Sequence, residues 1–290
     1  MSDYFSIFLS SANFRWVITG SLLLGFACGL IGTFVLLKKQ SLISDAMAHA
    51  ALPGVGIGFL FFNEKNLPVL LLGATLTSLL GTYLIQVIIK HSKLDTDAAI
   101  GVIISVFFGV GIVLLTFIQQ HATGNHAGLK EFIFGQAASL VNRDVQLITV
   151  SAIVLVLITM VCFKEFKIAI FDPHFAKGLG IPVSLLNGVL MLLIVGIVVI
   201  GIQMVGVVLI AALLITPPLS ARYWTDELPI MAGLSGVLGA LSGAIGTWFS
   251  ATIPNLPTGP MIVLVISAIF LISLLFGSKH GIVMKVVQTS

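Results

Sequence analysis

Charged residues are scarce in this sequence, and their scarcity decides the class of the protein. Only 9% of the 290 residues are Asp, Glu, Lys or Arg, whereas 58% are hydrophobic. A water-soluble domain has about 25% charged residues, because its surface must be solvated. The mean hydropathy of +1.16 shows the same excess of apolar residues. The chain lacks the polar surface of a soluble globule, so we expect most of its surface to face lipid.

Three other features are missing. The two cysteines, Cys28 and Cys162, lie in apolar runs and form no CxxC pair, so the cysteines indicate neither a redox site nor a zinc site. The net charge is only +3 and no Lys/Arg cluster is present, so nucleic acid is not expected as a partner. The sequence contains no GxxxxGK[ST] phosphate loop. Any energy from ATP would therefore have to come from another subunit.

Enzymatic motifs are also missing from the apolar runs. We find no HExxH motif, no paired carboxylates and no nucleophile next to a base. We therefore expect no enzymatic activity in this chain and no permanently bound cofactor.

Long apolar runs make up most of the sequence. A spanning helix needs about 20 apolar residues, because each residue adds 1.5 Å across roughly 30 Å of hydrocarbon. The first run is too long for the apolar part of a signal peptide, so we expect it to be retained. Nine runs qualify: Trp16–Leu37, Leu42–Phe62, Leu67–Ile89, Ala98–Ile118, Val145–Phe163, Val183–Ile200, Ile202–Leu219, Leu228–Phe249 and Pro260–Phe276.

The division of residues 183–219 into two spans is the weakest, because only Gly201-Ile202-Gln203 and Gly206 interrupt that stretch. We therefore predict an all-α integral membrane protein, a polytopic helical bundle of eight to nine spans. Residues 1–290 form one transmembrane domain in this interpretation.

Basic residues indicate the orientation, because cytoplasmic loops retain Lys and Arg. We predict that the N-terminal segment 1–15 is external and the C-terminal tail 278–290 is cytoplasmic. This orientation leaves only four basic residues outside. The ten basic residues on the cytoplasmic side are Lys38, Lys39, Lys90, Lys93, Lys164, Lys167, Lys177, Arg222, Lys279 and Lys285.

Small residues recur at helix-packing intervals. They are Gly25 and Gly29, then Gly233, Gly236, Gly239, Gly243 and Gly246. In lipid, small side chains allow helix backbones to approach closely. The pattern predicts internal packing of the bundle, with a subunit interface or a sliding surface as the alternative.

Asp45 is the carboxylate that falls inside an apolar run, and His49 follows it by four residues. In a helix this spacing puts both side chains on one face. A carboxylate inside a bilayer is costly and usually faces an interior pathway. Oxygen and imidazole nitrogen together suit Mn²⁺, Zn²⁺ or Fe²⁺. Pro53 and Gly54 should loosen the helix beyond, as in transporters with broken helices.

Three interpretations of the pair remain open at this stage. Asp45 and His49 could hold a metal ion in transit, could form a hydrogen bond that only orients the helix start, or could relay protons. The other histidines are weaker candidates. His121 and His126 flank a Gly-containing external loop and could touch an incoming metal ion, although a solvated loop explains them as well.

A cytoplasmic segment at about residues 164–182 separates two spans and could transmit force. Asp172 is a suitable N-cap, Pro173 suits the first helical position, and Gly178 or Gly180 can end a helix of two turns that includes His174. The alternatives are an interfacial linker and a docking element for a partner ATPase.

Several stretches together resemble the ABC-3 permeases of bacterial manganese, zinc and iron importers, and the manganese-associated members most. The resemblance covers about residues 15–277. The matching stretches are Leu37-Lys-Lys-Gln-Ser-Leu-Ile-Ser-Asp-Ala-Met-Ala-His-Ala-Ala-Leu-Pro-Gly54, Asp97-Ala-Ala-Ile-Gly101, Phe134-Gly-Gln-Ala-Ala-Ser139, Phe171-Asp-Pro through Leu-Gly-Ile-Pro182 and Leu256-Pro-Thr-Gly-Pro260.

The resemblance implies a fold like that of the vitamin B12 importer permease in the bacterial cytoplasmic membrane. It implies a second permease subunit, identical or paralogous, two ABC ATPase subunits below and an extracytoplasmic metal-binding protein above. It places the metal contacts on Asp45 and His49 and the coupling helix on about Asp172–Gly180. The alternative function is an ATP-independent, proton-coupled secondary transporter that uses the same pair.

Overall fold

The computed structural model describes residues 12–62, 67–121, 135, 142–253 and 256–284. All regular elements in these ranges are helices. Eight of them are long and apolar enough to cross a membrane. The helices are α2 (Ala12–Leu37), α3 (Ser41–Phe62), α4 (Leu67–His91), α5 (Thr96–His121), α7 (Asn142–Val161), α8 (Phe163–Phe171), α9 (Pro173–Gly178), α10 (Val183–Val205), α11 (Val207–Arg222), α12 (Leu228–Thr252) and α13 (Thr258–Phe276).

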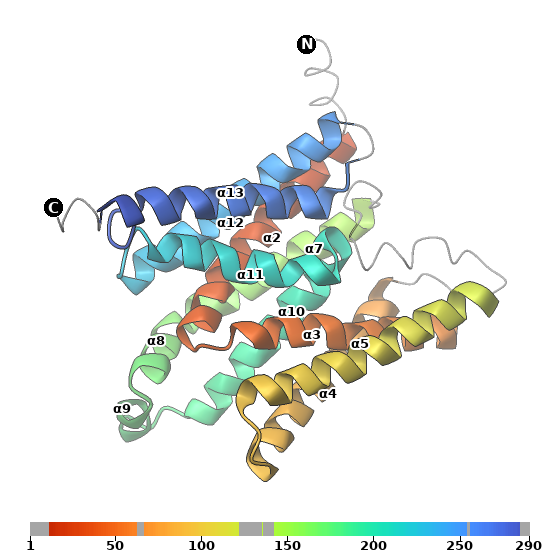
Figure 1. Ribbon diagram of the computed structural model, residues 1–290, viewed down its shortest axis with the longest axis horizontal. Coiled ribbons are helices and arrows are strands. Elements are labelled where there is room, and N and C mark those ends of the chain that lie inside the picture. The colour runs from red at the N-terminus through yellow and green to blue at the C-terminus, as the bar shows by residue number, and fades with distance from the viewer. Residues whose placement is uncertain (1–11, 63–66, 122–134, 136–141, 254–255, 285–290) are drawn as a thin grey trace.

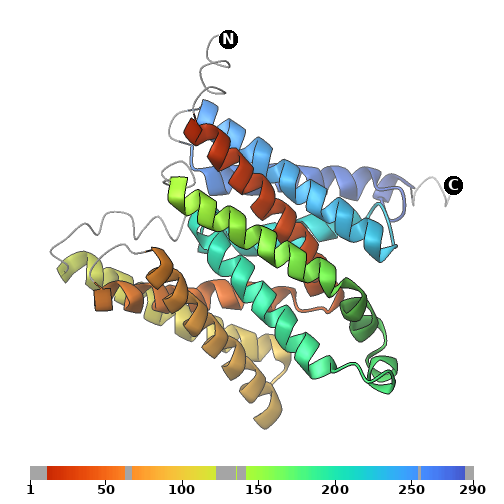
Figure 2. The ribbon, with the colours of Figure 1, turned by 180° about the vertical axis from the view of Figure 1, so that it is seen from behind.

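Successive long helices run back and forth between two ends of the bundle (Figures 1 and 2). One end, on the left in Figure 1, carries the turns after α2, α4 and α11 together with α8, α9 and the end of α13. We call it the basic end, because the Lys and Arg residues predicted to be cytoplasmic flank these helices. The prediction of a polytopic helical membrane bundle is confirmed.

The predicted boundary at residues 200–202 is wrong, and the chain reverses at Gly206 instead. Gly206 has φ 95° and ψ 161°, a conformation that only glycine adopts without strain. Gly201 stays helical, and its missing side chain leaves room for Ile210 of α11. At 16 residues α11 is shorter than the eight long helices and spans about 24 Å, slightly less than the hydrocarbon thickness.

Glycine and serine residues hold α2 against α12. A Cβ at Gly25 would collide with the backbone of Gly239, and a Cβ at Gly239 would collide with Gly25 in return. The hydroxyl of Ser235 donates to the carbonyl oxygen of Gly29 at 2.7 Å. Such interhelical hydrogen bonds contribute roughly 0.6–2 kcal/mol in lipid. For these residues the structure therefore favours internal packing over a subunit interface.

A second group of helices contains α3, α4 and α5. The expected break in α3 at Pro53 and Gly54 is absent. The chain remains helical from Ser41 to Phe62 with Pro53 inside. Gly54 instead packs directly on the backbone of Gly73 in α4. A Cβ at Gly111 of α5 would meet Leu52 and Pro53 at 2.6 and 3.2 Å. These glycines serve close packing of α3 against α4 on one side and α5 on the other.

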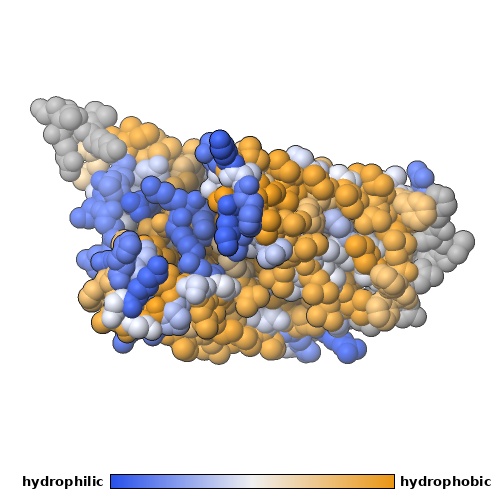
Figure 3. Space-filling model, turned by 90° about the horizontal axis from the view of Figure 1, so that it is seen from below, coloured by the Kyte–Doolittle hydropathy of each residue, from blue (hydrophilic) through white to orange (hydrophobic). Residues whose placement is uncertain are grey.

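The outer surface is largely apolar, as a lipid-facing surface must be. Figure 3 shows a face on which hydrophobic residues predominate, while hydrophilic residues gather toward the basic end. Large exposed side chains line α4, α7 and α13. Examples are Leu72, Leu76, Val150, Leu157, Leu264 and Leu271.

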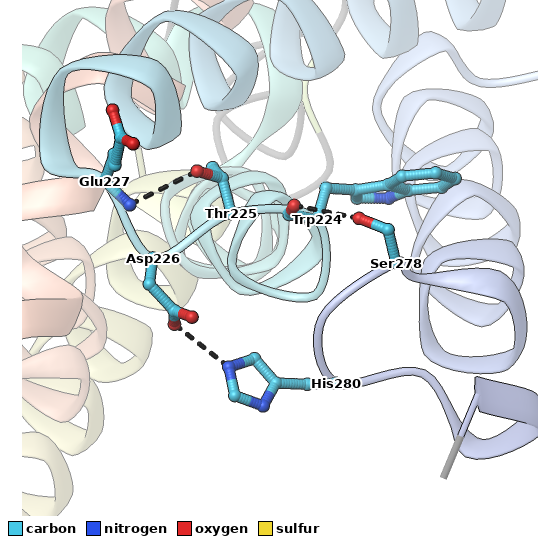
Figure 4. A network of polar contacts seen from close by, with 6 residues as sticks. All are labelled: Trp224, Thr225, Asp226, Glu227, Ser278 and His280. Atoms are coloured by element: carbon cyan, nitrogen blue, oxygen red, sulfur yellow. Dashed lines mark hydrogen bonds and ion pairs between the residues drawn. The ribbon is translucent and has the colours of Figure 1, made fainter. Parts of the chain in front are cut away.

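A polar network fastens the α11–α12 loop to the chain after α13 (Figure 4). His280 Nε2 donates to Asp226 Oδ1 at 2.9 Å, and the Ser278 hydroxyl donates to the carbonyl oxygen of Trp224 at 3.1 Å. The indole N–H of Trp224 donates to Ser273 at 3.0 Å. The hydrogen bond from His280 lowers the pKa of the Asp226 carboxyl below its ordinary value. This loop is therefore tied to its neighbours.

The basic end is predicted to face the cytoplasm, and cysteine labelling measures this. In a Cys162→Ser background, where Cys28 is fully buried, we expect His174→Cys to react with an impermeant maleimide only after cells are permeabilised. Ile253→Cys, at the opposite end of α12, should react in intact cells. Strong external labelling at position 174 would reverse the orientation.

Candidate functional site

The first half of α3 positions both residues predicted to contact metal. The chain enters α3 through a tight turn in which Lys39 has φ 56°, and the amide of Ile43 donates to the carbonyl oxygen of Gln40 at 3.0 Å. Asp45 and His49 follow one helical turn apart on the same face. The sequence-based expectation of their mutual position is thus confirmed.

The distance between the two side chains is informative. Asp45 Oδ1 lies 3.5 Å from His49 Nε2, which is longer than an N–H···O hydrogen bond of about 2.7–3.2 Å. Two ligand atoms about 2.1 Å from one ion, in tetrahedral or octahedral geometry, lie roughly 3.0–3.4 Å apart. A small movement of either side chain would therefore let both atoms bind one ion.

In the described part of the chain, polar atoms of His49 lack their usual hydrogen-bond partners. Its Nδ1 is buried and makes no hydrogen bond to the described part of the chain. Its ring meets Phe108 of α5 edge to face, with centroids 4.9 Å apart. Pro53 has no N–H, so the His49 carbonyl oxygen lacks its usual helical donor. The side chains of Asp45 and His49 thus offer a carboxylate and an imidazole one turn apart.

Within the described part of the chain, Asp45 and His49 make up only part of a metal site. Among the residues that the structure describes, no group of three or more His, Cys, Asp and Glu side chains could hold a metal ion. His121 is the last residue of α5, and the expectation for His126 lies outside the described ranges. The Asp45 side chain is 34% exposed, and the site is open rather than enclosed.

The segment predicted to dock an ATPase forms a short helix, as its capping residues indicated. The Asp172 carboxylate accepts a hydrogen bond from the Phe175 amide at 2.8 Å, and Pro173 begins α9. Gly180, with φ 78°, turns the chain away after the helix. A Cβ at Gly178 or Gly180 would meet nothing within 4 Å. The helix has only six residues, shorter than two full turns, because Gly178 ends it early.

The exposure of α9 was not visible in the sequence. All residues from Phe171 to Gly180, His174 included, are exposed except Ala176, which is buried. Phe175 and Leu179 are each 56% exposed although they are large and apolar. This segment therefore presents exposed apolar side chains at the basic end. A separate helix α8 was also missed, although its apolar residues at helical spacing could have indicated it.

Comparison with known proteins gives close relatives. The chain is 54% identical to the manganese transport system membrane protein MntC of Bacillus subtilis over 97% of its length, and it spans 64% of that longer relative. It is 42% identical to the zinc transport system membrane protein TroC of Treponema pallidum, over 92% of this chain and 89% of TroC. The relatives and the eight apolar helices identify a multi-pass protein of the bacterial plasma membrane.

Solved structures agree on the fold. PsaBC from Streptococcus pneumoniae in complex with Fab matches with a TM-score of 0.86 and 28% identity, over 99% of both chains. An inward-facing metal-chelate type ABC transporter shares the fold, with a TM-score of 0.63, 18% identity and 89% and 84% of the two chains covered. The model of the ABC 3 transport family matches residues 10–277, and the chain belongs to that family.

Proposed function

We propose that this chain is the membrane-spanning permease subunit of an ABC importer that moves a divalent transition metal ion, Mn²⁺ foremost, into the cytoplasm. The observation that carries this proposal is the Asp45–His49 pair, with its ligand atoms 3.5 Å apart. Carboxylate oxygen and imidazole nitrogen suit Mn²⁺, Zn²⁺ and Fe²⁺. The manganese and zinc transport systems named for the relatives support the same cargo.

A second permease copy would complete the coordination of the ion. The ring of Phe108 that touches His49 is 37% exposed on the outer face of α5. Gly101, Ser105 and Gly109 lie on that face at intervals of four residues, and all three are exposed. Small residues at this spacing favour close helix association in lipid. Two copies meeting here would bring two Asp45–His49 pairs toward one pathway.

Two ATPase subunits and an extracytoplasmic metal-binding protein complete the importer that we propose. The lack of a phosphate loop requires ATP hydrolysis elsewhere. The exposed apolar side chains of α9 offer a surface for the ATPase at the basic end. The opposite end, where α3 finishes and α12 ends, is the side at which a metal-binding protein would deliver the ion.

Reconstitution separates this function from proton-coupled secondary transport by the same pair. We expect that the chain, co-expressed and purified with its ATPase, takes up Mn²⁺ into proteoliposomes only when hydrolysable ATP is present. A protonophore should leave the rate unchanged, and a non-hydrolysable analogue should abolish it. Uptake driven by a pH gradient without ATP would establish the secondary transporter instead. Competition by Zn²⁺ and Fe²⁺ in the same vesicles ranks the cargo ions.

A further inference from the structure

The end of α2 contacts both flanks of residues 172–180, which contain α9 and which we call the coupling segment. On one side, the fully buried ring of Phe34 packs against Phe163 and Phe166 of α8, with each pair of centroids 5.3 Å apart. On the other side, Lys38 Nζ donates to Asn187 Oδ1 at 2.7 Å. Asn187 lies in the second turn of α10, the helix that follows the coupling segment. Along the chain, α9 therefore lies between two contacts, one made by the last turn of α2 and one by the residue that follows α2.

The Lys38–Asn187 contact is more than a surface hydrogen bond. Lys38 is half-buried, and this burial lowers the pKa of its ammonium group, because desolvation disfavours the charged form. A cation in such surroundings depends strongly on its hydrogen-bond acceptor. Its neighbour Lys39 is exposed and occupies the left-handed conformation that reverses the chain. The two lysines thus share a turn but differ in surroundings.

The same turn leads directly into the part of α3 that carries Asp45 and His49. The Gln40 amide donates to the carbonyl oxygen of Val35 at 3.1 Å, and the Ile43 amide donates to that of Gln40 at 3.0 Å. A third hydrogen bond, from Ser44 Oγ to the Ser41 carbonyl oxygen at 2.7 Å, stiffens the first turn of α3. Short, hydrogen-bonded connections of this kind transmit displacement rather than absorb it. Asp45 is the next residue.

We propose that Lys38 and Asn187 are positioning residues that carry movement of the coupling segment to the α2–α3 turn and so to Asp45 and His49. This inference rests on the proposed function. When an ATPase moves α9, α10 moves with it through the chain at residues 181–182. The hydrogen bond between Lys38 and Asn187 then displaces the α2–α3 turn, which precedes Asp45 and His49. The packing of Phe34 on α8 holds the rest of α2 in register.

The test compares coupling, not only uptake. The variants are Lys38→Met and Asn187→Leu, which keep side-chain size and remove the bond, together with the double variant. Asn187→Asp keeps an oxygen acceptor, and Lys39→Met makes the same change of charge at the exposed neighbour. Each complex of the full chain with its co-purified ATPase is reconstituted. Mn²⁺ taken up per ATP hydrolysed is measured beside the thermal midpoint and the yield of the complex.

We expect Lys38→Met and Asn187→Leu each to lower the ratio of Mn²⁺ to ATP about five- to tenfold, a typical coupling effect. Yield and thermal midpoint should stay close to those of the wild type. The double variant should be no worse than either single one, because both remove the same bond. Asn187→Asp and Lys39→Met should keep the wild-type ratio.

Three outcomes would overturn the inference. Lys38→Met could have the same ratio of Mn²⁺ to ATP as Lys39→Met. Alternatively, the losses in this ratio caused by Lys38→Met and Asn187→Leu could add in the double variant. Uptake and ATP hydrolysis could also fall together with the yield, as a purely structural bond predicts. A wild-type complex without ATP-driven Mn²⁺ uptake would instead overturn the proposed function, and this inference with it. A transporting wild type with a fully coupled Lys38→Met variant would overturn only the connection.

Discussion

Asp45→Asn is expected to abolish Mn²⁺ accumulation while leaving the protein in the membrane at its normal amount. The substitution keeps the size of the side chain and removes the charge that a divalent ion requires. Loss of an outer partner of a metal ligand already costs about 10- to 100-fold in affinity, and loss of a ligand should cost at least as much. His49→Ala should have the same effect, because the imidazole supplies the second ligand atom.

The double variant discriminates a shared ion from two separate roles. If Asp45 and His49 bind one ion, losing both should add little to losing one, because residues that act as a unit are not additive. Asp95→Asn is the matched control, since Asp95 is exposed in the α4–α5 loop at the basic end. Cellular manganese and zinc, measured in a strain without its own importers, give the result. Near wild-type accumulation by a well-expressed Asp45→Asn variant would refute the metal-ligand role.

Phe175→Ala combined with Leu179→Ala is expected to remove ATP-driven uptake without unfolding the permease. Both side chains are 56% exposed, so their truncation should change stability by no more than about 0.5 kcal/mol. At the centre of an interface, however, truncating an apolar anchor costs about 2 kcal/mol or more, roughly 30-fold in affinity. We therefore expect the ATPase to be lost from the purified complex.

Leu94→Ala is the control for this pair, because Leu94 is 48% exposed in another loop at the basic end. It should leave both uptake and association with the ATPase unchanged. The measurement is the amount of ATPase that co-purifies per permease, compared with Mn²⁺ uptake in the same membranes. Full retention of the ATPase by the double variant would show that α9 is not the docking element.

Local features of the site could be predicted because they depend on residues close together in the chain. Asp45 and His49 share a face in any helix, since their spacing of four residues decides it. Asp172 caps α9 because its side chain reaches an amide three residues ahead. The sequence could not reveal that α3 continues through Pro53 and Gly54, since that depends on packing against Gly73 and Gly111 in other helices.

The sequence by itself determined that the protein spans the membrane, where most spans lie and which residues form the candidate metal pair. Its scarcity of charge and its long apolar runs leave no other environment for the chain. Only the tertiary structure decided that the chain reverses at Gly206 and not at Gly201, because Ile210 from α11 occupies the space beside Gly201. Only it placed Asn187 beside Lys38, 149 residues away in the chain. Helix periodicity records the neighbours within one helix, whereas contacts between helices arise from how whole surfaces pack.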